Sequence, residues 1–284
     1  PVVPFSPAWP VRSLADVDAA LVAPGARFEM ETVDIRGVPI RVWKNAPASM
    51  RALAEGARAW GDREFTIYED ERVTYEANYR AVCHLAAGMR ELGVAKGDRV
   101  ALAMRNLPEW PVIFFATVSI GAIIVPLNAW WTIGEVEYAL ADSGAKLLFV
   151  DGERHERLKG CYDRMPALER VIVSRAKGEL AGASRLEVLI GTRKDWAGLD
   201  DVGLPDAGIA PDDEATIFHG ATCAPVELTG SDPGDHPTFR CVTYVEQTGE
   251  EECFAEPSSA MRLRRARRTE PAETPIVSIR RSER

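Results

Sequence analysis

The strongest constraint on the fold is an alternation of short apolar runs with amphipathic segments between residues 99 and 174. The apolar runs predict strands at residues 99–104, 122–126, 146–150 and 171–174. The segments between them predict helices at residues 109–119, after a Thr132–Glu135 capping signature, and at residues 154–164. Strands that alternate with helices at this spacing indicate a mostly parallel sheet flanked by helices. We therefore expect an α/β fold.

The flanking segments add local elements to this sheet. Two hairpins are predicted, one at residues 33–35 and 40–43 and the other at residues 65–69 and 72–75. Helical spacing covers residues 48–60, and a long helix capped by Thr74 is expected to end at Gly93. A short helix is expected near residues 185–190 and a short strand at residues 216–218.

Composition narrows the class of protein. The hydrophobic fraction of 46% supports a sizeable core, and the net charge of −9 argues against nucleic acid as a general partner. The five cysteines are scattered and form no C-x-x-C pair, which favours reduced thiols over disulfides or a zinc site. The start of the sequence shows no signal-peptide pattern. We therefore expect a cytoplasmic protein without a bound metal of its own.

One segment has the length and apolar character of a transmembrane helix. Residues 110–127 carry no charge and are long enough to span a bilayer. However, Pro111, Pro126 and Gly121 interrupt the run, and the β-branched residues 123–125 favour a strand. No cluster of Lys or Arg lies just beyond either end to orient a span. A buried helix followed by a buried strand is the preferred interpretation, with no integral membrane span.

The last part of the chain differs in composition from the rest. Residues 219–260 carry eight acidic residues and one arginine, whereas residues 261–284 carry eight arginines and three glutamates. Charge blocks with few large apolar residues cannot offset the entropy cost of ordering, so we expect a disordered tail after about Pro225. The alternative for the arginine-rich run at residues 261–268 is a nucleic-acid or membrane-surface patch.

Several short motifs, in this order and spacing, resemble one enzyme family. They are Trp43-Lys44-Asn45-Ala46-Pro47, Tyr68-Glu69-Asp70-Glu71-Arg72-Val73-Thr74-Tyr75, Gly97-Asp98-Arg99-Val100-Ala101, Asn106-Leu107-Pro108-Glu109-Trp110 and Gly121-Ala122-Ile123-Ile124-Val125-Pro126-Leu127-Asn128. Over residues 28–218 the chain is similar to the N-terminal part of the class I adenylate-forming (AMP-binding) enzymes, in particular the acyl-CoA synthetases (fatty acid–CoA ligases).

This resemblance implies a reaction and its small-molecule partners. Such enzymes join a carboxylate, here expected to be a fatty acid, to ATP with Mg²⁺ and form an acyl-adenylate and pyrophosphate. They then transfer the acyl group to the thiol of coenzyme A. A Gly-rich loop directly after a strand begins Thr-Ser-Gly and ends Pro-Lys-Gly. Its backbone N–H groups, hydroxyls and lysine offset the repulsion between carboxylate and triphosphate.

The matching segment in this chain is His219-Gly220-Ala221-Thr222-Cys223-Ala224-Pro225-Val226. The remnant of the nucleotide-phosphate loop comprises Gly220, Ala221, Thr222 and Pro225. It departs from the family pattern because the leading Thr-Ser pair is absent, a glycine is replaced by Cys223, and Val226 stands where the lysine belongs. The alternative is that residues 220–226 form an ordinary surface turn.

These observations define three expected regions. Residues 1–47 form an N-terminal extension with a hairpin, residues 48–218 form a partial AMP-binding domain, and residues 219–284 contain the degenerate loop and the tail. No candidate appears for the family's later motifs or its C-terminal catalytic lysine. The simplest account is a truncated acyl-CoA synthetase that is inactive as it stands. The alternative is a non-catalytic remnant that binds a nucleotide, an acyl chain or a partner protein.

A few side chains outside the loop are further candidates. Trp130 and Trp131 are interpreted as the border of an acyl pocket or, alternatively, as a cap on the core. Asp142, Asp151 and Glu153 are expected to be helix caps and surface charges. No residue is assigned a catalytic role.

Overall fold

A five-stranded parallel sheet lies at the centre of the fold. The structure is a computed structural model that describes residues 13–180 and 182–219. The strands are β5 (Arg99–Ala103), β6 (Ile123–Pro126), β7 (Leu147–Asp151), β8 (Arg170–Ser174) and β9 (Ser184–Arg185). They lie in the order β6-β5-β7-β8-β9, and each neighbouring pair is parallel. The predicted α/β fold with a mostly parallel sheet is confirmed.

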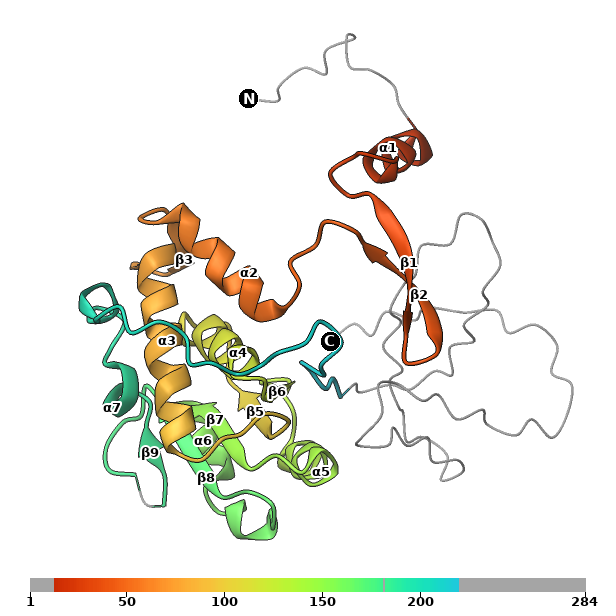
Figure 1. Ribbon diagram of the computed structural model, residues 1–284. Helices are drawn as coiled ribbons and strands as arrows, with labels where there is room; N and C mark the ends of the chain where they lie inside the picture. Colours follow the sequence, from red (N-terminus) through yellow and green to blue (C-terminus); the bar gives the residue numbers. More distant parts are fainter. Residues whose placement is uncertain (1–12, 181, 220–284) are drawn as a thin grey trace, which may run out of the picture. The chain divides into compact units, whose positions relative to one another are not determined.

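Helices cover both faces of this sheet (Figure 1). The helices α3 (Tyr75–Glu91) and α4 (Glu109–Ser119) pack on one face, and α5 (Ile133–Ser143) and α6 (Gly152–Leu158) pack on the other. Side chains of a strand alternate between the two faces, so Val100 and Leu102 join the first core cluster while Ala101 and Ala103 join the second. All four are buried, as expected for a parallel strand covered on both sides.

The remaining elements surround this core. The helix α1 (Leu14–Val22) precedes the antiparallel hairpin β1 (Met30–Ile35) and β2 (Val38–Trp43). The helix α2 (Met50–Ala57) continues into the 3-10 turn η1 (Arg58–Trp60) and the hairpin β3 (Glu64–Tyr68) and β4 (Glu71–Thr74). Later short helices are η2 (Tyr162–Arg164), α7 (Glu187–Ile190) and η3 (Trp196–Gly198).

Local sequence signals explain where the main helices begin and end. Thr132 and Glu135 form the predicted capping box at the start of α5. Thr74 caps α3 by accepting a hydrogen bond from the backbone N–H of Ala77. Gly93 follows α3 with a φ of +89°, a conformation that glycine adopts without a steric cost.

Some sequence-based boundaries were wrong. The helix expected over residues 154–164 ends at Leu158, and a separate 3-10 turn follows after Gly160. The strand expected at residues 216–218 consists of a single parallel bridge between Thr216 and Ile124. The two-residue strand β9 was not predicted, because a strand this short has no periodicity to detect.

The apolar run at residues 110–127 forms α4 and β6, which both contribute to the first core cluster. The predicted buried helix followed by a buried strand is therefore confirmed. Within the described part of the chain, no helix combines the length and the apolar character needed to cross a membrane.

Candidate functional site

The order of the strands identifies the edge of the sheet where a ligand is expected. The chain passes from β5 to β6 on one side and then returns to β7 on the other side of β5. In open α/β sheets, ligands bind beyond the carboxyl ends of the strands at such a topological switch point. The candidate site therefore comprises the residues that follow β5, β6 and β7.

A buried ion pair occupies this switch point. Asp151 ends β7 and caps α6, with its Oδ1 accepting a hydrogen bond from the Arg154 backbone N–H over 2.9 Å. The Arg154 guanidinium Nη1 lies 3.2 and 3.1 Å from the two carboxylate oxygens of Asp151. The two residues are only 4% and 3% exposed. Asp151 is a cap, as predicted, but the prediction that it is a surface charge was wrong.

The same pair ties three strand ends together. The backbone N–H of Arg105, after β5, donates to Oδ2 of Asp151 over 3.0 Å. Arg154 Nε donates to the carbonyl of Ala129, after β6, over 2.9 Å. The third nitrogen of the Arg154 guanidinium, Nη2, is buried without a hydrogen-bond partner in the structure. These hydrogen bonds hold the switch point together, and of the residues that make them only Asp151 was singled out from the sequence.

The two predicted tryptophans separate at this edge. Trp130 is 67% exposed, and the guanidinium carbons of Arg105 and Arg154 lie 5.1 and 5.4 Å from its ring centroid. Trp131 is partly buried and packs against the second core cluster. Trp130 thus lies at the surface of the switch point, whereas Trp131 supports the core beneath it. The assignment of Trp130 and Trp131 to the border of an acyl pocket stays a prediction.

The remnant of the phosphate loop follows His219, the last residue that the structure describes. Gly220, Ala221, Thr222 and Pro225 lie outside the described residues. Just before them, the backbone N–H of Ile217 donates to the carbonyl of Ile124 over 2.9 Å, which places this segment beside β6. His219 Nε2 lies 3.0 Å from Oδ2 of Asp142 on α5.

A second charge cluster, built around the buried carboxylate of Glu109, lies beyond β8. Arg175 Nε lies 2.9 Å from Oε1 of Glu109, and its Nη2 lies 2.8 Å from Oε2 of Glu71. Arg193 contacts the same two carboxylates. Burial alone would lower the pKa of Arg175, but hydrogen bonds and charge attraction from Glu109 and Glu71 raise it above its ordinary value. This cluster joins the start of α4 to β4.

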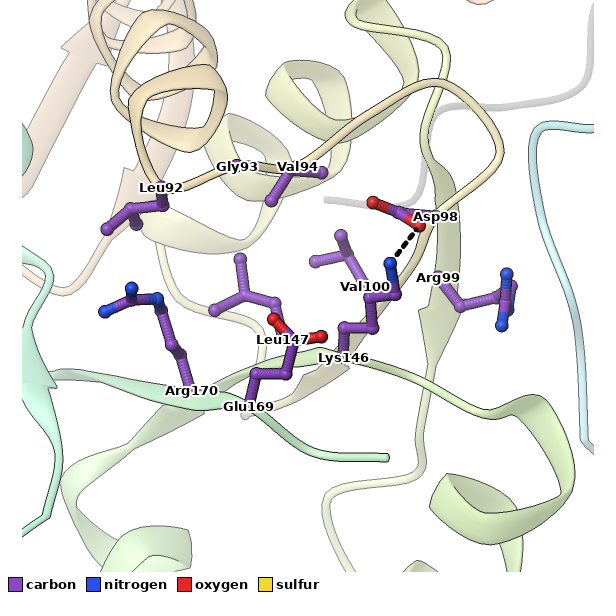
Figure 2. Close-up of a pocket in the computed structure, with 10 residues that line it drawn as sticks. All are labelled: Leu92, Gly93, Val94, Asp98, Arg99, Val100, Lys146, Leu147, Glu169 and Arg170. Carbon is purple, nitrogen blue, oxygen red and sulfur yellow. Dashed lines mark ion pairs between the residues drawn. The ribbon is translucent and has the colours of Figure 1, made fainter. Parts of the chain in front are cut away.

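The small cavity of Figure 2 lies at the opposite edge of the sheet. Its lining includes Arg99, Leu147 and Arg170, which begin β5, β7 and β8. The figure also shows the ion pair between Lys146 and Asp98, whose Nζ and Oδ1 are 2.8 Å apart. A volume of about 20 Å³ has room for roughly one water molecule and not for a substrate.

The described residues offer no ligand set for a metal. Within residues 13–180 and 182–219, no group of three or more His, Cys, Asp or Glu side chains is arranged to hold one. The carboxylate of Asp151 is already paired with Arg154.

Fold and site geometry together define a doubly wound α/β domain with its topological switch point between β5 and β7. The family model of the AMP-binding enzymes matches residues 53–219. The chain belongs to the family of AMP-binding enzymes.

Several curated proteins that the chain resembles are named as CoA ligases or synthases. The chain is similar to a feruloyl-CoA synthase from Amycolatopsis, with 43% identity over 34% of this chain and 21% of that protein. It is 38% identical to the long-chain-fatty-acid–CoA ligase of Escherichia coli over 32% of this chain and 16% of that protein. The acyl-CoA ligase sidI of Aspergillus fumigatus is 28% identical over 62% of this chain and 30% of that protein. The chain thus spans less than a third of the length of these curated relatives.

Solved structures share the fold. An anthranilate CoA ligase in complex with anthranoyl-AMP matches with a TM-score of 0.53 and 22% identity, over 63% of this chain and 33% of that one. The coronafacic acid ligase of Pectobacterium brasiliense matches with a TM-score of 0.53 and 20% identity, over 60% of this chain and 33% of that one. At this level of identity the similarity concerns the fold.

Proposed function

We propose that residues 53–219 are the N-terminal part of the domain that activates a carboxylic acid in an acyl-CoA ligase. The family match over these residues carries the proposal. The reaction condenses a carboxylate with ATP to an acyl-adenylate and pyrophosphate. The thiol of coenzyme A then displaces AMP and forms the thioester. We assign a fatty acid as substrate, with an aromatic acid such as ferulate as the competing class, because named relatives act on each.

We further propose that the chain of 284 residues does not itself form the adenylate at a useful rate. The support comes from the loop sequence, in which Val226 replaces the lysine and Cys223 replaces a glycine. Removing one preorganised donor costs about 3 kcal/mol of transition-state stabilisation, roughly a hundredfold in rate. Several losses in one loop need not add, but each acts in the same direction.

A cytoplasmic location agrees with the two described cysteines, Cys83 and Cys161, which are both free and buried.

A chimera tests the family role separately from the loop. Residues 53–219 would replace the matching segment of the E. coli long-chain-fatty-acid–CoA ligase, which supplies its own phosphate loop and remaining domains. We expect acyl-CoA formation from a fatty acid in this chimera. A chimera that is folded by circular dichroism and gel filtration but forms no acyl-CoA would contradict the proposal. Ferulate used in preference to a fatty acid would overturn the substrate class alone.

A further inference from the structure

An apolar groove of about 480 Å³ lies between α2, α3, α4 and the start of the hairpin β3–β4. The helix α2 packs against both α3 and α4 (Figure 1). Two large apolar side chains of the groove remain exposed to solvent: Trp60 is 52% exposed and Leu53 is 43% exposed. The residues that line the groove include no charged side chain. An exposed apolar surface of this kind favours an uncharged, apolar segment as its partner.

Aromatic rings form much of the lining of this groove. The ring centroids of Phe65 and Tyr75 are 4.8 Å apart, and those of Trp60 and Tyr75 are 6.1 Å apart. The helix α2 contributes the small residues Ala52 and Gly56, which leave room for a close approach. Grooves lined by aromatic rings bind proline-rich segments in the polyproline II conformation, which is preformed and has little entropy to lose. The lining of this groove has the composition of such a site.

The chain carries a proline-rich segment of the matching kind at residues 1–11. Prolines occupy positions 1, 4, 7 and 10. A polyproline II helix has three residues per turn, so this spacing places all four prolines along one edge of the helix. No charged side chain precedes Arg12, whereas residues 219–284 carry blocks of charge that an apolar groove would exclude. Residues 1–12 lie outside the described residues and directly precede Ser13, the cap of α1.

We propose that residues 1–11 of the chain itself dock in this groove as a polyproline II helix, with Pro4-Phe5-Ser6-Pro7 at the centre of the contact. The helix α2 has 8 residues and is therefore about 12 Å long. One turn from Pro4 to Pro7 rises about 9 Å, so it fits along α2. The four prolines restrict the undocked segment as well, which lowers the entropy cost of docking. This contact is separate from the β5–β7 switch point.

A photo-crosslinker at position 5 tests this docking in the full chain of 284 residues. The variant Phe5→p-benzoylphenylalanine is irradiated at low protein concentration, and its adducts are mapped by digestion and mass spectrometry. The benzophenone reacts with C–H bonds that it contacts, so we expect adducts within residues 47–82 and at Phe115, in a product with the mass of one chain. Adducts on other surfaces, or no defined adduct, would overturn the proposal. A product with the mass of two chains would assign the groove to the segment of a second copy and would also overturn it.

Two glycines supply matched variants of the groove. Gly56 lies in the groove on α2, and a Cβ built there meets nothing within 4 Å. G56L should raise helix propensity and occupy the place of the segment, and we expect the adduct yield to fall by about fivefold or more. Gly134 on α5 is also open around its Cβ and does not line the groove, so G134L should leave the yield unchanged. An unchanged yield in a G56L chain that is folded by circular dichroism would overturn the proposal.

The double variant P4A/P7A tests the segment and leaves residues 13–284 as they are. Alanine lacks both the pyrrolidine ring and the fixed φ of proline, so the adduct yield should fall by roughly fivefold or more. S6A is the control, because it changes the same turn of the segment but keeps both prolines. Equal yields from P4A/P7A and S6A would show that the prolines do not make the contact, and the proposal would be wrong.

Discussion

The backbone N–H of Arg105 donates a hydrogen bond to Oδ2 of Asp151 over 3.0 Å and thereby joins the carboxyl ends of β5 and β7. The other oxygen of Asp151 caps α6, and both oxygens face the guanidinium of Arg154. One carboxylate therefore fixes the geometry of the topological switch point. Removal of this carboxylate should therefore destabilise the sheet as a whole.

We predict that D151A lowers the free energy of unfolding by about 3–5 kcal/mol, because it removes the buried counter-charge of the Arg154 guanidinium and leaves only the exposed carboxylate of Glu153 beside it. Urea denaturation followed by circular dichroism measures this loss. E153A is the matched control, because Glu153 also lies 3.0 Å from Arg154 Nη1 but its side chain is 61% exposed. An exposed ion pair contributes less than about 1 kcal/mol. Similar losses in the two variants would contradict this account of the switch point.

The charge cluster beyond β8 gives a second prediction. Glu109 is 3% exposed and pairs with both Arg175 and Arg193. E109Q keeps the shape of the side chain but leaves two arginines facing Glu71 alone. We expect a loss of about 3 kcal/mol in the free energy of unfolding.

The control for this prediction is E156Q. Glu156 pairs with Lys159 on α6, but their side chains are 60% and 55% exposed. Its substitution should change the free energy of unfolding by less than about 1 kcal/mol. A change in E109Q no larger than that in E156Q would show that the buried carboxylate of Glu109 adds nothing to stability.

The third prediction concerns pH. His155 is 3% exposed, and burial lowers its pKa below the ordinary value of 6.5. Glu156 opposes this shift, whereas Lys159 adds to it. The unfolded chain therefore binds a proton as pH falls through about 6.5, while the folded chain does not until a lower pH. The contribution of neutral His155 to the free energy of unfolding is fully present above pH 6.5. The free energy of unfolding should decline as the pH falls below 6.5.

Urea denaturation at pH 7.5 and 5.5 measures this decline. H155Q should lose less stability between these two pH values than the unmodified chain, because it removes the titrating group. Y162F is the control: it removes the hydroxyl that lies 3.1 Å from His155 Nδ1 but keeps the imidazole. It should keep the pH dependence. An unchanged pH dependence in H155Q would assign the decline to other groups.

The parallel sheet could be predicted from sequence because each of its longer strands is buried on both faces. Runs such as residues 147–151 are continuously apolar up to Asp151, and capping residues such as Thr132 mark where the next helix begins. The strand β9 and the break after Leu158 were missed, because two residues of strand and one short turn leave no periodic signal. Tertiary packing, not local preference, defines these elements.

The candidate site was less predictable for a physical reason. Asp151, Arg154 and Arg105 are ordinary charged residues in the sequence, and only the strand order β5-β7 brings them together. The strand order depends on which helix crosses which face, and no local pattern encodes it. Arg175 and Arg193 lie in a polar segment that resembles a surface loop, although both contact buried Glu109. Position in the fold therefore gives these residues their roles.

The last prediction concerns the phosphate loop. In pyrophosphate exchange with ATP and a panel of fatty and aromatic acids, the unmodified chain should show no activity above background. A lysine and a glycine can be placed after Pro225 by the double substitution V226K/E227G. A lysine that donates a charge-assisted hydrogen bond to a phosphate contributes about 1.5–3 kcal/mol. ATP binding should therefore tighten by roughly tenfold or more, measured by calorimetry with the full chain.

The matched control is V226Q/E227G, which makes the same change at Glu227 and supplies a neutral donor in place of the lysine. We expect most of the gain in ATP affinity to be absent from this variant. The gain in V226K/E227G should also shrink as salt rises, because the added interaction is between charges. Robust exchange by the unmodified chain would show that the loop functions without a lysine. Equal ATP affinities of the two variants would show that residue 226 does not face the phosphates, and residues 220–226 would then be an ordinary surface turn.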